Sequence, residues 1–197
     1  MLITNDFEVE EPVDDVWRFF DDIPQVAACL PGAELTEQTD ESTYQGRVAI
    51  RLGPVRLEFG GTATITERDD ANRRIVVDAT GADVKGRGQA AMLLIATVTS
   101  TPQGSRVEVA QDLTLSGAAA QYGRGMITDV TSVLMGDFAT NMENRLDAIR
   151  RGVSPDEVAT AKPAGGLVIA LRAARMALAR VLRRFFLPYR PPAATNA

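Results

Sequence analysis

Alternating apolar and polar residues predict a series of strands through residues 2–116. Ile3, Phe7 and Val9 alternate with other side chains near the start of the chain and indicate a strand over 2–10. Six further strand-like runs cover 33–39, 43–52, 55–67, 74–82, 88–101 and 105–116. Short polar turns join these six runs, which is the pattern of an antiparallel meander.

Helical patterns flank the meander on both sides. Pro12 begins a short helix that contains Trp17, and a second short helix runs toward Leu30. From 118 to 151 the apolar spacing becomes that of a long helix, which Gly152 is expected to end. The apolar stripe of this helix comprises Tyr122, Met126, Val130, Val133, Phe138, Met142, Leu146 and Ile149.

This order of elements predicts an α+β fold, in which a curved antiparallel sheet of about seven strands wraps around the long C-terminal helix. Sheet and helix are expected to touch poorly at one end, so that an internal hydrophobic cavity remains. Alternate residues of each strand, together with the apolar face of the long helix, are predicted to form the wall of this cavity. The predicted wall residues are Tyr44, Val48, Ile50, Leu57, Phe59, Met92, Leu94, Val107, Val109, Leu113, Met126 and Val130.

Three polar side chains could hydrogen-bond a ligand at the edge of this cavity. The hydroxyls of Tyr44 and Tyr122 and the amide of Gln111 are suitable donors to a quinone carbonyl. Alternatively, a buried tyrosine bonds a nearby backbone carbonyl. No catalytic residue and no metal ligand is predicted, because the chain has no histidine and one cysteine, Cys29.

The C-terminal part of the chain carries the opposite charge to the rest. Residues 1–157 hold 14 basic and 26 acidic side chains, whereas 158–197 hold seven basic side chains and no acid. A basic amphipathic helix is predicted over 166–188, between a flexible linker at 152–165 and a disordered terminus at 189–197. The residues expected to bind a membrane are Leu171, Arg172, Arg175, Leu178, Arg180, Leu182, Arg183, Arg184, Phe185 and Phe186.

Arginines spread along this helix argue against its crossing a bilayer, because each costs about 2.5–3.5 kcal/mol near the membrane centre. A helix that lies in the headgroup layer keeps its guanidinium groups beside lipid phosphates. The predicted partner is therefore an anionic membrane surface. Packing of the helix on the acidic body and docking on a partner protein are the alternatives. Nucleic acid is disfavoured, since the negative body repels phosphate.

The first residues of the chain and its cysteine content indicate the cellular compartment. Residues 1–6 show no charged stretch followed by an apolar run, so no secretory signal is visible. A single cysteine excludes internal disulfides. The expected location is the cytoplasm, with peripheral attachment to the cytoplasmic face of the cell membrane.

Six short stretches occur in order along the body of the chain. They read CLPGAEL at 29–35, YQG at 44–46, LGPV at 52–55, FGGTA at 59–63, AQYGRG at 120–125 and FATN at 138–141. In these stretches and in its order of elements, the chain closely resembles the G-subunit family of carbon monoxide dehydrogenase. That family belongs to the START-like helix-grip superfamily, also called SRPBCC. The resemblance covers residues 1–151, and the C-terminal part matches in type alone.

The superfamily resemblance implies a deep pocket for a hydrophobic small molecule. The family resemblance implies a non-enzymatic accessory protein that links a molybdenum carbon monoxide dehydrogenase to the membrane and its quinone pool. We therefore expect a respiratory quinone, menaquinone or ubiquinone, as bound ligand, with no covalent cofactor, and electron transfer to the respiratory chain. The alternatives are a ligand-free docking protein, a maturation factor for the dehydrogenase, and an enzyme of the cyclase or aromatase type.

Overall fold

The computed structural model describes residues 1–52, 55–155 and 158. Within these residues, the strands are β1 (Leu2–Val9), β2 (Ala33–Gln38), β3 (Thr43–Leu52), β4 (Val55–Asp69), β5 (Arg74–Asp83), β6 (Gln89–Thr101) and β7 (Gly104–Leu115). The helices are α1 (Val13–Phe19), α2 (Ile23–Cys29), the short 3-10 helix η1 (Ala119–Gln121) and α3 (Arg124–Arg150).

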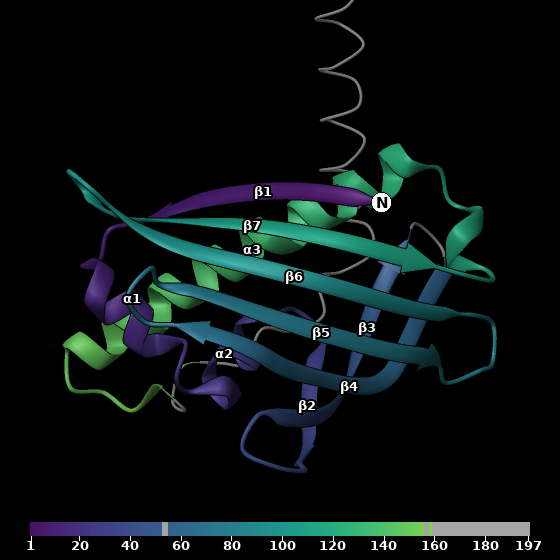
Figure 1. The fold of residues 1–197 in the computed structure, drawn as a ribbon, viewed down its shortest axis with the longest axis horizontal. Helices are drawn as coiled ribbons and strands as arrows, with labels where there is room; N and C mark the ends of the chain where they lie inside the picture. Colours follow the sequence, from purple (N-terminus) through teal and green to yellow (C-terminus); the bar gives the residue numbers. More distant parts are fainter. Residues whose placement is uncertain (53–54, 156–157, 159–197) are drawn as a thin grey trace, which may run out of the picture.

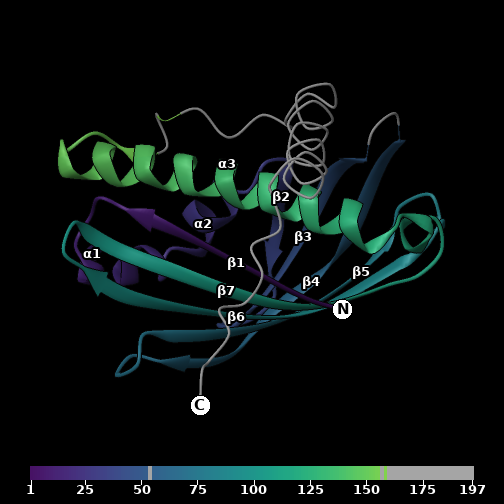
Figure 2. The ribbon, with the colours of Figure 1, turned by 90° about the horizontal axis from the view of Figure 1, so that it is seen from above.

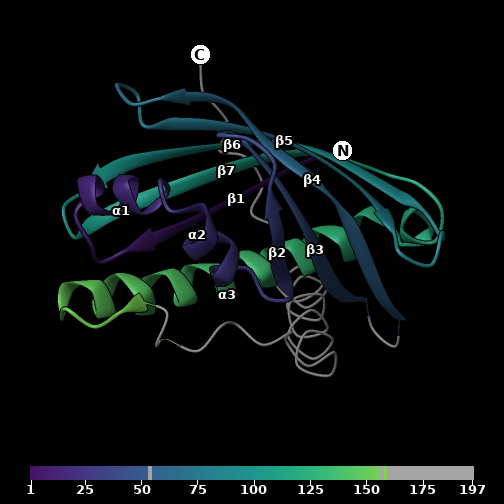
Figure 3. The same cartoon turned by 90° about the horizontal axis from the view of Figure 1, so that it is seen from below.

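The strands form one antiparallel sheet with the order β1-β7-β6-β5-β4-β3-β2. The sheet curves around α3, which crosses its concave face (Figures 1 and 2). Helices α1 and α2 cover one end of this face, beside the C-terminal half of α3 (Figure 3). The predicted meander wrapped around a long helix is confirmed. Pairing of β1 with β7 adds the first strand to the end of the meander.

The long helix starts later than the apolar spacing predicts. Residues 119–121 form η1, Tyr122 is extended, and Gly123 is the N-cap of α3. The chain reverses direction between β7 and α3, and Gly117 permits this with φ +66° and a neighbouring carbonyl oxygen 2.0 Å from where a Cβ would lie. Gly152, with φ +72°, ends α3 as predicted.

One half of the space between the sheet and α3 is filled. The indole Nε1 of Trp17 donates to Asp70 at 3.0 Å, and the Arg68 guanidinium lies 4.2 Å from its ring centre. Because α1 brings aromatic side chains to this half and α2 adds Val26 and Cys29, it is closely packed. The buried cluster comprises Val9, Val16, Trp17, Phe19, Phe20, Cys29, Ile75, Ala96, Val98, Val107, Val109, Phe138, Met142 and Leu146.

Arg145 ties the segment after α3 to the body. Its buried guanidinium donates to the side-chain oxygen of Gln25 in α2 and to the carbonyl oxygen of Pro155 at 2.9 Å. The described part of the predicted linker therefore lies against the body. The remainder of that linker, the predicted helix at 166–188 with its membrane-binding residues, and the predicted disordered terminus at 189–197 lie outside the described residues.

A row of residues with little or no side chain crosses four strands. Gly46 of β3 pairs with Gly61 of β4, Gly61 pairs with Gly81 of β5, and Gly81 pairs with Ala90 of β6. A Cβ on Gly61 would lie 1.9 Å from the carbonyl oxygen of Thr80 on the neighbouring strand. Glycine is therefore required for β4 to approach β5 in this way.

Asp83 holds the β5–β6 hairpin together. Its carboxylate accepts hydrogen bonds from Arg87 Nε at 2.7 Å and Nη2 at 2.8 Å, and from the backbone N–H groups of Glu58 and Lys85. These bonds, above all those from Arg87, hold the pKa of Asp83 well below its ordinary value, although burial opposes them. The lowered pKa stabilises the folded state above the unfolded pKa of about 3.9. That contribution is lost as the pH falls through the folded value.

We predict that Gly61→Ala destabilises the protein by about 1–3 kcal/mol, because the new Cβ forces β4 away from β5. Gly60→Ala is the matched control, since a Cβ at this neighbouring position would meet its first neighbour only at 3.8 Å. Chemical denaturation of the two variants and the wild type measures the effect. Equal stability of the two variants would contradict the requirement for glycine at position 61.

Asp83→Asn is expected to lower the unfolding midpoint at about pH 7, because an amide cannot keep the charge-assisted bonds from Arg87. The difference from the wild type should persist down to about pH 5 and shrink below about pH 4, where the unfolded carboxyl takes up a proton. Thermal denaturation across this range is the measurement. Asp78→Asn, at an exposed position of the same strand, is the control. A difference that does not change with pH argues against a role for the charge.

Candidate functional site

The other half of the space between the sheet and α3 is hollow. A cavity of about 380 Å³ lies there, within the size range of small-molecule pockets. Its wall combines residues of β2 to β7 with one face of α3, the residue after α2 (Leu30) and Ala119 of η1. Most of these wall residues are aliphatic or carry no side chain beyond a methyl group.

Small residues in the sheet explain why this half stays open. The inward positions of four adjacent strands are Gly46, Gly61, Gly81 and Ala90, and all four line the cavity. None of them has a side chain that reaches α3. In the filled half, by contrast, α1 and α2 insert side chains such as Trp17 between sheet and helix. The cavity therefore exists because this row of the sheet has no large inward side chains.

Nine of the twelve side chains predicted for ligand contact lie in the cavity wall. They are Tyr44, Val48, Leu57, Phe59, Met92, Leu94, Gln111, Leu113 and Val130, and the predicted wall residue Ile50 joins them. Strand parity places the strand residues correctly, because alternate side chains of a strand point to the same face. Contact of these residues with a ligand stays a prediction.

Three predicted wall residues and the predicted edge donor Tyr122 lie outside the cavity wall, and the prediction is corrected for them. Val107 and Val109 have inward parity, but they belong to the first part of β7, which lies in the filled half before the strand reaches the cavity at Gln111. Tyr122 precedes α3 and packs beside the wall without lining the cavity. Met126 is 46 % exposed, because the face of α3 that meets the cavity begins one residue later, at Ile127.

Sequence reasoning missed many wall residues, among them two sets that share a pattern. The first lies on α3 with the spacing of one helical face: Ile127, Val130, Thr131, Leu134 and Met135, of which Val130 alone was predicted. The spacing could have revealed this face, had Ile127 been taken as its start. The second set is the row of small residues in the sheet. They point toward α3, but the prediction selected large apolar side chains and so did not include them.

Charged side chains occur only at the edge of the cavity. Among the wall residues that the structure describes, Glu34 of β2 and Arg47 of β3 are the charged ones. They are cross-strand neighbours joined at 3.4 Å, and both are largely exposed. Such a pair contributes little to stability. The interior therefore offers no charge to a bound molecule.

Two polar side chains reach the interior, one from the sheet and one from the helix. Gln111 of β7 is 5 % exposed, and its side-chain amide makes no hydrogen bond with another residue of the described part. Thr131 of α3 also lines the cavity, but its hydroxyl donates to the carbonyl oxygen of Ile127 at 2.9 Å. The Tyr44 hydroxyl accepts from Gln38 at 3.4 Å in an exposed position. Of the predicted donors, Gln111 is the deeply buried one.

Comparison with known families identifies this arrangement. The profile of the carbon monoxide dehydrogenase G-subunit, CoxG, matches residues 6–147. The chain belongs to the CoxG family. The match extends from β1 into the last turns of α3, so it includes every wall residue of the cavity that the structure describes. A search among curated proteins finds no match.

Solved structures share the fold of this CoxG family member. A conserved protein from Geobacillus kaustophilus is 17% identical with a TM-score of 0.67, over 75% of this chain and 95% of the other. The ZhuI aromatase/cyclase from Streptomyces sp. R1128 is 14% identical with a TM-score of 0.56, over 77% and 96%. A START superfamily protein from Mycobacterium smegmatis is 12% identical with a TM-score of 0.51, over 75% and 98%. These similarities confirm the predicted START-like helix-grip fold.

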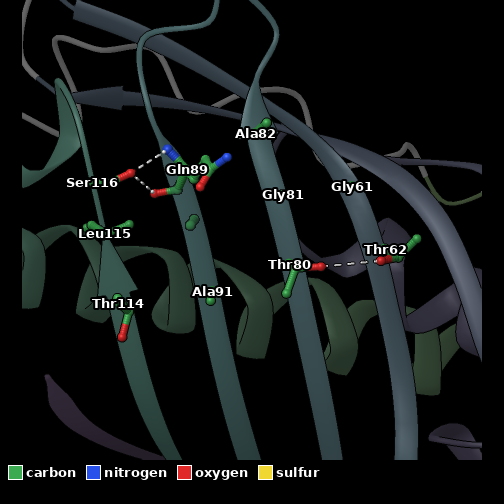
Figure 4. A pocket seen from close by; sticks show the side chains of 11 residues that line it. Gly61, Thr62, Thr80, Gly81, Ala82, Gln89, Ala91, Thr114, Leu115 and Ser116 are labelled. Atoms are coloured by element: carbon green, nitrogen blue, oxygen red, sulfur yellow. Dashed lines mark hydrogen bonds between the residues drawn. The ribbon is translucent and has the colours of Figure 1, made fainter.

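A second hollow lies on the outer face of the sheet in this CoxG family member (Figure 4). It measures about 500 Å³ and is more open than the inner cavity. Its hydroxyls bond within the sheet, Thr62 with Thr80 at 3.5 Å and Ser116 with the backbone of Gln89 (Figure 4). The inner cavity is smaller, but it is less open and its wall is mostly apolar, so it is the better candidate for a hydrophobic ligand.

Cys29 is a structural residue. Burial raises the pKa of its thiol to about 12, although the nearby Arg145 acts in the opposite direction. The thiol lies 3.3 Å from the carbonyl oxygen of Gln25, to which it donates. It is therefore protonated at neutral pH and is a poor nucleophile.

The described residues contain no group of three carboxylates or thiols able to hold a metal ion. They also include no helix that is long and apolar enough to cross a membrane.

Proposed function

We propose that this protein binds a respiratory quinone, menaquinone or ubiquinone, in the cavity between its sheet and α3. The observation that carries the proposal is a partly open apolar cavity of about 380 Å³ between the sheet and α3 in a member of the CoxG family. A quinone ring with an isoprenoid chain is almost wholly apolar, so its transfer from water into this space is favourable. Its carbonyl oxygens need one or two donors, a number that the wall can supply.

The shape of the cavity suits a ligand with a compact head and a long chain. No charged group reaches the interior from the part of the chain that the structure describes, and the Glu34–Arg47 pair marks the exposed edge beside β2 and β3. A ring and the first part of its chain occupy the interior, and the rest of a long isoprenoid chain leaves along this edge. At the inner end, α3 and the sheet shield the ring from most of the surrounding water.

The proposal includes a role between the membrane and a molybdenum carbon monoxide dehydrogenase. Membership in the CoxG family supports the dehydrogenase as partner. The charge distribution supports the membrane: residues 158–197 are basic, whereas the body is strongly acidic. An anionic lipid surface attracts the basic segment and repels the body. The protein thus lies peripherally on the cytoplasmic face of the membrane and brings quinone to the enzyme, so that electrons reach the respiratory chain.

In this proposal the protein is a carrier and not an enzyme. A cyclase or aromatase, the activity named for the ZhuI structure, needs acid–base groups inside its pocket. The carboxylate of the described wall, Glu34, is exposed and paired with Arg47 at the edge. A ligand-free docking protein or a maturation factor has no need of the hollow. Carriage of a hydrophobic ligand accounts for the cavity more directly.

Quinone uptake from vesicles tests the proposal. Wild-type protein incubated with menaquinone-loaded vesicles and then separated from them should retain quinone, measured by organic extraction and mass spectrometry. Met92→Trp fills the cavity and is expected to lower the retained quinone about tenfold or more. Leu93→Trp is the matched control, because Leu93 is the next residue of β6 and lies on the outer face, 44 % exposed. Failure of the wild type to retain quinone, or equal retention by both variants, would sink the proposal.

Vesicle flotation tests the membrane role. Reversal of Arg180, Arg183 and Arg184 to glutamate in the full chain should lower binding to anionic vesicles by at least about two orders of magnitude, since each arginine contributes about 1 kcal/mol and each glutamate adds repulsion. The effect should vanish on neutral vesicles. The control carries the same change at three exposed arginines of the body: Arg18, Arg51 and Arg56. Equal flotation of both variants and the wild type would remove the membrane role.

A further inference from the structure

An unpaired amide lies inside the apolar cavity. Gln111 lines the cavity and is 95 % buried, and its side-chain amide forms no hydrogen bond with any other described residue. Burial of an amide without a partner costs free energy, so such groups are rare in folded proteins. An apolar residue at this position would avoid the cost. The amide therefore fits a partner that arrives from outside the chain.

The position of Gln111 distinguishes the inner end of the cavity from its charged edge. The next inward residue on one side, Val109, belongs to the filled half, whereas Leu113 on the other side lines the hollow. Its cross-strand neighbour Leu94 also lines the hollow and packs against the filled half. Gln111 thus stands where the hollow meets the packed core. Strands β4, β5 and β6 separate it from Arg47 at the charged edge.

We infer that the Gln111 amide anchors the polar head of the ligand at this inner end, with the chain directed toward the edge. The inference rests on the proposed function and specifies it. It selects a neutral lipid whose head carries a carbonyl or hydroxyl group. A fatty-acid carboxylate or a phospholipid head finds no opposite charge among the described interior residues, and burial of an unpaired charge is costly.

An amide suits a carrier of both redox forms of a quinone. The Nε2 group of Gln111 donates to the carbonyl of an oxidised quinone, and its Oε1 accepts from the hydroxyl of the reduced quinol. A rotation of the amide exchanges the two roles, which a lysine or a carboxylate could not do. The anchor therefore holds the head in either state with similar affinity.

Equilibrium binding to the full-length protein tests the anchor. The probes are a short-tailed menaquinone, its quinol prepared under anaerobic conditions, and the matching hydrocarbon without oxygen atoms. Gln111→Leu should weaken quinone and quinol binding about tenfold each, as expected for the loss of one hydrogen bond. It should leave hydrocarbon binding unchanged and raise the melting temperature of the ligand-free protein. Gln89→Leu, on the exposed outer face, is the control and should change none of these.

The possible outcomes separate this inference from the proposed function. If the wild type binds quinone and Gln111→Leu binds it equally well, the anchor is wrong and the proposed function stands. If Gln111→Leu melts at a lower temperature and loses all three probes equally, Gln111 is structural and the inference fails. If palmitate competes for the cavity as strongly as quinone does, the cavity does not select ligands with neutral heads, and that part of the inference fails. Absence of binding of every probe by the wild type ends both proposals.

Discussion

The close approach of β4 to β5 at Gly61 is the constraint on which the cavity depends. A Cβ there would meet the Thr80 carbonyl oxygen at 1.9 Å, so the strands can lie this close only if the position is glycine. The same residue belongs to the row of Gly46, Gly61, Gly81 and Ala90, which presents almost no side chain to α3. One set of small residues thus shapes the sheet and leaves the space beneath it unfilled.

The two halves of the molecule divide stability and function between them. Helix α1 brings aromatic side chains to one half and α2 adds smaller apolar ones, so that this half packs into a continuous core and holds α3 in place. The other half gives up that packing, and the apolar contacts it lacks are available to a ligand. Because α3 belongs to both halves, the filled half can fix the helix above the hollow without occupying it.

Charge is arranged around the hollow and not within it. The described interior holds neutral side chains, and the charged wall residues Glu34 and Arg47 pair with each other at the edge. Asp83 and Arg87 pair at the end of the β5–β6 hairpin, where they stabilise the rim of the sheet. A neutral interior with a single free amide at Gln111 favours uncharged lipids. The proposed binding of a quinone is consistent with this distribution.

The sequence by itself determined the strands, their parity and the family, because alternation along a strand is a local property of the backbone. It placed Tyr44, Leu57, Met92 and Leu113 on the correct face. The tertiary structure decided which inward positions face a hollow: Val109 is packed and Leu113 is not, although their parity is the same. That difference depends on what lies across from each residue, and α1, α2 and α3, which lie across, come from distant parts of the chain. The exposed face of α3 at Met126 was set in the same way, by the sheet against which the helix packs.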